Sequence, residues 1–290
     1  MAQIQASELI VNPDGSIFHL HLKPEEIADT IILVGDQNRV DVVAEFFDKV
    51  EVTKQNREFR TKTGTYNGSR ITVLSTGIGT DNIDIVVNEL DALANIDLDK
   101  REVKDTHRQL TFVRIGTSGA LQADIPVDTP VISKIACGFD GLLNFYEGRD
   151  KISNLALENQ FLDHMGYYKK LAVPYFVESD EDLYGILKPG CTEGITISAP
   201  GFYGPQGRVL RLDIKDGDIN EKISNLELDG DRFTNYEMEC SAIYGLSKLL
   251  GHRAVTICNI IANRKRGEYS KDYKTEIKKT IKTVLDRLTY

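Results

Sequence analysis

Short apolar runs alternate with stretches of helical periodicity along most of the chain, and this alternation limits the folds open to it. The apolar runs, which are typical of buried strands, span residues 30–34, 71–75, 110–115, 131–135 and 254–261. Amphipathic helices are predicted over residues 82–95, 237–250 and 271–288. Strand, crossover helix and strand in repetition form a mostly parallel sheet with helices on both faces. The sequence therefore predicts an α/β fold, a single domain with a mixed, mostly parallel central sheet flanked by helices.

Composition places the chain among globular proteins. It has 290 residues, 41% of them hydrophobic and 27% charged, which is enough to bury a full core. The 44 acidic residues outnumber the 35 basic ones and leave a formal charge of -9. Such a surface repels polyanions, so we expect no nucleic-acid partner, although arginines gathered in a pocket can still hold one small anion.

The cysteines and the apolar segments indicate a cytoplasmic protein. No CxxC pair occurs, and the four cysteines resemble buried free thiols in a reducing compartment: Cys137, Cys191, Cys240 and Cys258. Residues 1–11 lack the basic start and apolar core of a signal peptide, and the longest apolar run, residues 254–262, is too short to cross a bilayer. We therefore expect neither export nor a membrane anchor.

Three segments that follow predicted strands carry glycines and groups able to bind an anion. Ligands of α/β sheets collect at the carboxyl ends of the strands. The first segment places Gly35 and Arg39 at the start of a helix, and the second, residues 75–81, is again glycine-rich before a helix. The third adds Arg114 and the hydroxyl of Thr117 within one expected turn. Turn geometry alone would explain one such segment, but three in succession indicate a cage for a free phosphate ion.

Familiar cofactor and catalytic motifs do not occur in the sequence. Residues 77–79 lack the third glycine of a dinucleotide fingerprint, and there is no GxxxxGK[ST] loop. Ser118 does not lie in a GxSxG elbow, and the five histidines show no metal-ligand spacing. We therefore expect no NAD, no nucleoside triphosphate, no catalytic metal and no organic cofactor.

The segment FYGPQGR, residues 202–208, suits the recognition of a small polar ring. Gln206 offers a donor and an acceptor side by side, and Arg208 supplies a planar fork for an exocyclic oxygen that becomes negative when a base leaves. Phe202 can cover the face of the ring. Taken alone, the segment also fits a solvated Gly/Pro turn.

A second polar segment, NYEMEC, is expected to begin the helix over residues 237–250. Glu237 and Glu239 flank Met238, so a carboxylate there can accept both hydroxyls of a ribose while the thioether lies under the sugar. The alternative is that the two carboxylates only interact favourably with the helix dipole.

Taken together, six ordered motifs resemble those of the nucleoside phosphorylase family of α/β enzymes. They are GDxxR, Arg57-Glu58-Phe59, STGIG, RIGTSGA, FYGPQGR and NYEMEC. The resemblance runs from about Phe18 to the C-terminal helix. FYGPQGR is the segment that separates the uridine-specific members of this family from their purine-specific relatives.

The resemblance implies a role for each candidate residue. The phosphate-binding residues would be Gly35, Arg39, Arg57, Arg114 and Thr117, with Arg57 supplied by a neighbouring subunit. The base-binding residues would be Phe202, Gln206 and Arg208. Catalysis would rest on Arg208, Gln206 and Arg114. The ribose-binding residues would be His19 from a neighbouring chain, Glu237, Met238 and Glu239.

The implied reaction is phosphorolysis of uridine to uracil and α-D-ribose 1-phosphate in pyrimidine salvage, with 2′-deoxyuridine and thymidine as further candidate substrates. Inorganic phosphate would be the co-substrate, and no cofactor would be needed. Asn263 stands where purine-specific relatives carry an Asp that helps to protonate the departing base, which favours a pyrimidine. The alternatives are a purine nucleoside phosphorylase, a nucleosidase that uses water, and a nucleoside sensor without activity.

Some segments depart from the family pattern. Residues 1–17 are expected to form an N-terminal extension, and the charged stretches 97–109 and 212–232 are expected to be surface insertions. No metal site is expected. Asn82 replaces a serine that helps some relatives to bind a monovalent cation, which leaves Glu58 as the remaining candidate ligand for such an ion.

The resemblance also implies an assembly. Because His19 and Arg57 are expected to act across an interface, we expect a homo-oligomer. A dimer would be the smallest active unit, and a hexamer is the alternative.

Overall fold

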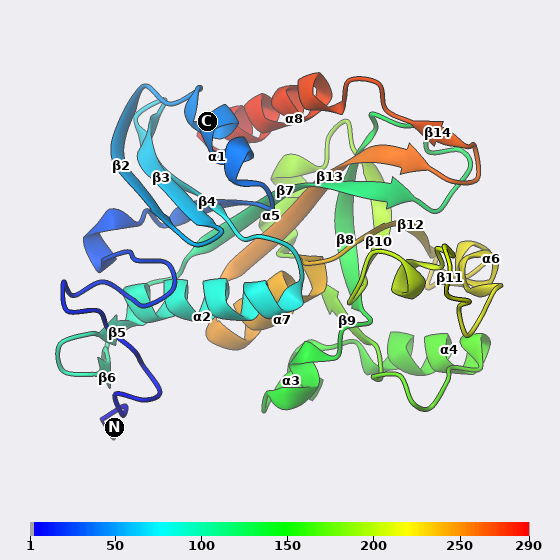
Figure 1. Ribbon diagram of the computed structural model, residues 1–290, viewed down its shortest axis with the longest axis horizontal. Coiled ribbons are helices and arrows are strands. Elements are labelled where there is room, and N and C mark those ends of the chain that lie inside the picture. The colour runs from blue at the N-terminus through cyan, green and yellow to red at the C-terminus, as the bar shows by residue number, and fades with distance from the viewer. Residues whose placement is uncertain (1–2, 290) are drawn as a thin grey trace.

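A long, twisted mixed sheet forms the centre of the protein (Figure 1). The computed structural model describes residues 3–289. Twelve strands of this part join the sheet, ten of them in the spatial order β11 (Glu227–Leu228), β12 (Asp231–Glu237), β10 (Thr192–Ser198), β8 (Pro130–Gly138), β13 (Arg253–Asn263), β7 (Thr111–Ala120), β1 (Thr30–Val34), β4 (Ser69–Ser75), β3 (Phe59–Tyr66) and β2 (Lys49–Asn56). β9 (Tyr175–Glu178) pairs with β8, and β14 (Glu268–Tyr269) pairs with β13.

Strand direction divides the sheet into two parts. β1, β4, β7 and β13 are mutually parallel, so their carboxyl ends meet at one edge. β12 pairs with β10 and also, in antiparallel fashion, with the end of β7. This second pairing closes β7, β13, β8, β10 and β12 into a ring of strands. The predicted α/β fold with a mixed, mostly parallel sheet is confirmed.

Helices cover both faces of the sheet. One layer consists of α1 (Gln37–Ala44), α5 (Glu181–Leu187) and α8 (Tyr273–Leu288). The opposite layer consists of α2 (Thr80–Asn95) and α7 (Cys240–Leu250), which pack side by side (Figure 1), with the short α3 (Arg149–Ile152) beside α7. α4 (Leu155–Met165) and α6 (Ile219–Ser224) cover the end of the sheet near β11. No helix within residues 3–289 combines the length and the apolar character needed to cross a membrane.

The amphipathic pattern predicted for α2 matches its packing. All five residues of the expected face are fully buried in the largest apolar cluster: Ile83, Val86, Val87, Leu90 and Leu93. Leu9 and Ile17, from the segment expected as an N-terminal extension, are buried in the same cluster. Residues 97–109 lie mostly on the surface and contain β6 (Glu102–Val103), which pairs with β5 (Ile96–Asp97) in a separate two-stranded ribbon.

Three expectations about local structure need correction. Residues 114–120 do not form a turn, because β7 continues through them to Ala120. Residues 235–237 end β12, and α7 begins only at Cys240. The segment 212–232 is not only a surface insertion, since Ile223, Leu226 and Leu228 are buried against the aromatic cluster around α4.

Candidate active site

A cavity of about 870 Å³ opens at the edge where the parallel strands end. It collects residues from segments far apart in the sequence. The wall includes these residues predicted from the sequence: Gly35, Arg39, Glu58, Arg114, Thr117, Phe202, Gln206, Arg208, Glu237, Met238 and Glu239. The three glycine-bearing segments and the two polar segments singled out in the sequence therefore face one space, although the third of these segments lies within β7 and does not follow it.

Two guanidinium groups lie at one end of this cavity. Arg39 stands in the first turn of α1, which Asp36 caps by accepting the amide of Asn38 at 2.9 Å. Nη1 of Arg39 donates to the carbonyl of Ile115 at 3.3 Å. Burial and the nearby charge of Arg114 lower the pKa of Arg39. Because like charges disfavour each other, this pair favours an anion between them.

Arg114 is a buried cation of the cavity. Its Nη1 lies 3.2 Å from Oε2 of Glu237, and its Nη2 is paired with Glu239. Nη1 also lies 3.1 Å from Sγ of Cys258. Burial opposes the positive charge, but Glu239 and Glu237 outweigh it and raise the pKa of Arg114. Gly116 leaves the space for this arrangement, because a Cβ there would lie 2.2 Å from Nη1 of Arg114.

The strand pairing explains why the two carboxylates meet Arg114. Tyr236 of β12 lies opposite Gly119 of β7, and the two strands are antiparallel. The chain that follows Tyr236 therefore runs back along β7, and Glu237 and Glu239 reach the guanidinium from that side.

Glu237 and Glu239 have different surroundings. Glu237 accepts hydrogen bonds from Ser198 Oγ at 2.5 Å and from the amides of Glu239 and Cys240, both at 2.9 Å. Burial and the charge of Glu239, opposed by Arg114, raise the pKa of Glu237 to about 7. Glu237 therefore holds the start of α7 and Arg114 in place, and these contacts do not support the expectation that it binds ribose. Glu239 has fewer partners, with Oε1 accepting the amide of Gly79 at 2.8 Å.

The loop from Phe202 to Arg208 forms the other end of the cavity. Nη1 of Arg208 donates to the carbonyl of Phe202 at 2.6 Å and to Oε1 of Gln206. The Cζ atom of Arg208 lies 3.9 Å from the centroid of the Phe202 ring. Gly207 has a φ of +70°, and a Cβ there would lie 2.3 Å from Nδ2 of Asn220, so the turn requires glycine. Gln206 is buried although Phe202 is half exposed.

Arg264 is a cavity residue that the sequence reasoning missed. Its Nη2 donates to the carbonyl of Gln206 at 2.6 Å. Burial and the charge of Arg264 lower the pKa of Arg208, so the end of the cavity formed by the loop from Phe202 to Arg208 also holds two guanidinium groups. The sequence did contain a signal, since Arg264 follows the strand predicted over residues 254–261.

The neighbouring Asn263 does not face the cavity. Its Nδ2 donates to the carbonyls of Gln122 and Ile125, both at 2.8 Å, and its Oδ1 accepts the amide of Arg266. These bonds hold Asn263 against the loop after β7, so the side chain does not lie beside the departing base as the resemblance implied.

His19 and Arg57 lie together outside the cavity of their own chain. Nδ1 of His19 lies 2.6 Å from Oε1 of Glu89, and the His19 carbonyl accepts Nδ2 of Asn56 at 2.8 Å. The Cζ atom of Arg57 is 5.9 Å from the ring of Phe18, which contacts His19 edge to face. The two residues expected to act on a neighbouring subunit therefore form one patch.

Comparison with known proteins identifies the family. Residues 29–289 match the family model described as the phosphorylase superfamily. The chain belongs to this superfamily. A uridine phosphorylase from Thermococcus kodakarensis is 31% identical over 260 residues, which cover 89% of this chain and 81% of that protein. A guanosine phosphorylase from Halorubrum lacusprofundi is 27% identical over 280 residues, or 93% of this chain and 97% of its own length.

A solved structure also supports the assignment of this chain to the phosphorylase superfamily. The crystal structure of a Trypanosoma brucei nucleoside phosphorylase that shows uridine phosphorylase activity matches with a TM-score of 0.87 and 28% identity. The match covers 97% of this chain and 99% of that one. The resemblance to the nucleoside phosphorylase family inferred from six motifs is confirmed.

One cluster outside the cavity has the composition of a metal site. Asp91, His107 and His252 each place one potential ligand atom within 4.8 Å of the others. However, Nδ1 of His252 accepts the amide of Leu110 at 3.1 Å, so its Nε2 carries the proton and faces Oδ1 of Asp91 at 3.1 Å. A protonated nitrogen cannot ligate a metal, and these bonds explain the cluster as a structural connection of α2 to the segment just before β13.

Proposed function

We propose that this phosphorylase cleaves uridine with inorganic phosphate, giving uracil and α-D-ribose 1-phosphate. The observation that carries the proposal is the placement of charge along one cavity. Arg39 and Arg114 lie at one end, Arg208 and Arg264 at the other, and Glu239 lies beside Arg114. The first end suits a phosphate dianion, and the second suits the oxygens of a base that leaves as an anion.

In the proposed reaction, a phosphate oxygen forms a bond to C1′ of the ribose as the bond from C1′ to N1 of uracil breaks. The electron pair of the broken bond stays on the base, which later takes a proton from water. Arg208 would stabilise the negative oxygen of the base, while Gln206 would hold the ring in register. No covalent intermediate with the protein is required, since positioning and charge complementarity supply the catalysis.

The ribose would lie between the two ends. Met238 lines the cavity beside Glu239, so the thioether can lie under the sugar while the Glu239 carboxylate accepts its hydroxyls. Because Glu239 is paired with Arg114, a ribose bound to Glu239 would stand next to the phosphate that Arg114, Arg39, Thr117 and the amide of Gly35 hold.

The active unit would contain at least two chains. His19 and Arg57 form a patch outside their own cavity, from which they would reach the ribose and the phosphate of a neighbouring subunit. A dimer would be sufficient for this exchange, and a hexamer built from dimers would preserve it.

Other parts of the proposal concern the cellular setting and the substrate range. Three of the four cysteines are buried, and all four are free thiols, which suits work in the cytoplasm in pyrimidine salvage. 2′-Deoxyuridine and thymidine differ from uridine by one hydroxyl or one further methyl, a difference typically worth only about 1–3 kcal/mol. The reaction would need no cofactor. Glu58 lines the cavity near Asn82 and is the candidate ligand should a monovalent cation take part.

The test is base release from uridine and from inosine, each with and without inorganic phosphate. We expect rapid uracil release only when phosphate is present, and slower release of hypoxanthine. Faster turnover of inosine would indicate a purine nucleoside phosphorylase. Uracil release that does not depend on phosphate would indicate a nucleosidase.

A further inference from the structure

The cavity of about 870 Å³ that holds Arg114 and Arg208 is called the nucleoside cavity below. A second cavity, of about 1000 Å³, lies beside it and is separated from it by the loop from Phe202 to Arg208. Phe202 and Gln206 line the nucleoside side, whereas Tyr203 and Pro205 line the other side. Arg208 borders both cavities. The proposed reaction assigns nothing to this second space, although its size is that of a small-molecule site.

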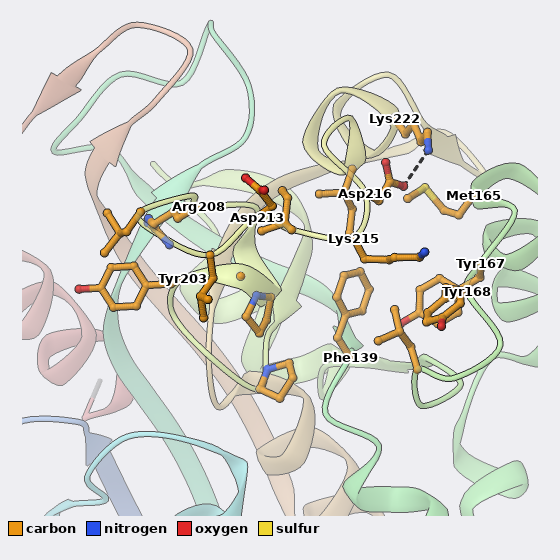
Figure 2. Close-up of a pocket in the computed structure, with 18 of the residues that line it drawn as sticks. Phe139, Met165, Tyr167, Tyr168, Tyr203, Arg208, Asp213, Lys215, Asp216 and Lys222 are labelled. Atoms are coloured by element: carbon orange, nitrogen blue, oxygen red, sulfur yellow. Dashed lines mark hydrogen bonds and ion pairs between the residues drawn. The ribbon is translucent and has the colours of Figure 1, made fainter.

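The walls of the second cavity are mostly apolar and aromatic. Figure 2 shows Tyr203 on one side, Tyr167 and Tyr168 on the other, and Phe139 between them. Phe139 and Met165 are buried, while Tyr168 and Leu171 remain more than two-fifths exposed. Flat aromatic side chains on opposite sides suit a planar apolar ligand. Apolar surface gathered in a concave site usually marks a binding function.

The charges of the wall set the sign of the ligand. Lys222 is paired with Asp216 at 2.7 Å, so these two charges neutralise each other. Among the residues of the described chain, neither Lys215 nor Arg211 has a carboxylate within ion-pair distance, and Asp213 has no cation. Among the described residues that line only this cavity, the unpaired charges are therefore two cations, Lys215 and Arg211, and one anion, Asp213.

Lys215 is the cation best placed to meet a ligand. Its side chain extends across the cavity toward Tyr167 and Tyr168 in Figure 2, with Nζ 5.2 Å from the Tyr168 ring centroid. Arg208, by contrast, already donates to Phe202 and Gln206 on the nucleoside side. An ammonium group over an aromatic wall suits a ligand with a flat apolar body and one negative group.

We propose that this second cavity binds a planar apolar anion, such as an aromatic carboxylate or sulfonate, between the tyrosines and Lys215. The binding does not depend on the proposed reaction, because Arg208 is the only described residue that lines both cavities.

The probe for the test is 8-anilinonaphthalene-1-sulfonate, with N-phenyl-1-naphthylamine as its uncharged counterpart. Fluorescence titration of the full chain should show one sulfonate probe bound per chain, and saturating uracil should not displace it. Lys215→Met should weaken the sulfonate probe roughly 5- to 10-fold and leave the uncharged probe unchanged. Leu171→Trp, which fills the cavity, should weaken both probes at least about 10-fold.

Ile186→Trp supplies the matched control, since Ile186 on α5 is 47% exposed, close to the 49% of Leu171, and lies outside the cavity. This variant should bind both probes as the native chain does. Displacement by uracil would place the probe in the nucleoside cavity and overturn the proposal. Equal binding to Leu171→Trp and to the native chain would do the same, since it would indicate adventitious binding only. If the probe binds less as the chain associates with itself, a second copy of the chain occupies the cavity, and this result would also overturn the proposal.

Discussion

Arg208 and Arg114 lie at opposite ends of the nucleoside cavity and differ in burial and in the contacts that hold them. Arg208 is only partly enclosed and is kept in place by the Phe202 carbonyl, the Phe202 ring and Gln206. Arg114 is buried and fixed by two carboxylates. A change at Arg208 should therefore affect the chemistry more than the fold, whereas a change at Arg114 should affect both.

Replacement of Arg208 by alanine should lower kcat/KM for uridine by about 10²–10³, because it removes one donor from the developing negative charge of the base. The measurement is steady-state uracil release at saturating phosphate. Arg266→Ala is the control, since Arg266 is exposed, pairs with Glu268 at 2.7 Å, and should be dispensable for turnover. Near-native turnover of the Arg208→Ala enzyme would remove Arg208 from the mechanism.

Glu237 should make the stability of the fold depend on pH. Its pKa is about 7 in the folded protein against 4.5 for an ordinary Glu. The folded state therefore binds a proton more tightly than the unfolded state, so the contribution is complete below pH 4.5 and is lost as pH rises through 7. Native protein should lose about 2.5 kcal/mol more stability than Glu237→Gln between pH 5 and pH 8.

Urea unfolding at the two pH values measures this difference. Glu227→Gln, at an exposed position of β11, should follow the native profile. Parallel profiles for the native chain and Glu237→Gln would show that Glu237 titrates alike in both states.

At the level of the elements, β7 is the strand on which the site depends. It pairs with β1, β13 and β12, and it carries both Arg114 and Thr117 into the cavity. Its course past Arg114 requires a residue without a side chain at position 116.

Gly116→Ala should therefore displace the Arg114 guanidinium. The added Cβ would lie 2.2 Å from Nη1 of Arg114 and 3.0 Å from Sγ of Cys258. We expect a loss of stability of about 1–3 kcal/mol and a fall in kcat/KM of at least about 10-fold, with a raised KM for phosphate.

Gly185→Ala in α5 is the contrasting variant, because no heavy atom lies within 4 Å of the added Cβ. It should stabilise the protein by roughly 0.5–1 kcal/mol and leave activity unchanged. Thermal unfolding and uridine kinetics of the two variants test both expectations. An unaltered KM for phosphate in Gly116→Ala would separate Arg114 from phosphate binding.

Sequence patterns predicted the buried elements better than the edge ones. The strands over residues 30–34 and 254–261 were recognisable because they are continuous apolar runs covered on both faces. β2 has half-exposed and exposed residues throughout, so its sequence lacked such a run. The end of β12 was mistaken for a helix start because its buried Glu237 is stabilised by Arg114 and Ser198, contacts that no local pattern reveals.

The candidate site, too, was predictable only where local sequence patterns determine it. Strand ends indicated Gly35, Arg39 and Arg114 because ligands collect there whatever the sequence details. The different partners of Glu237 and Glu239 depend on the antiparallel pairing of β12 with β7. No local sequence pattern predicts this pairing of distant segments. The orientation of Asn263 away from the cavity depends likewise on the loop carbonyls of Gln122 and Ile125.

At the scale of the whole molecule, the proposal makes activity a property of an assembly. Each site would combine Arg208 and Arg114 from one chain with His19 and Arg57 from another. A two-fold dimer would then contain two such composite sites.

Mixing two inactive variants tests this arrangement. Arg57→Ala and Arg208→Ala should each have little activity alone. In a mixed dimer one of the two sites keeps both arginines, so random assortment should restore roughly a quarter of native activity. Refolding each variant alone is the control. No gain on mixing would show that Arg57 acts, if at all, within its own chain.

Phosphate, and not water, is expected to displace the base from C1′ of the ribose. Phosphorus-31 NMR of the protein with uridine and inorganic phosphate tests it directly, with uracil measured in the same sample. We predict that α-D-ribose 1-phosphate appears in equal amount with uracil, while the phosphate signal falls by the same amount. Uracil accompanied by free ribose and an unchanged phosphate signal would contradict the account.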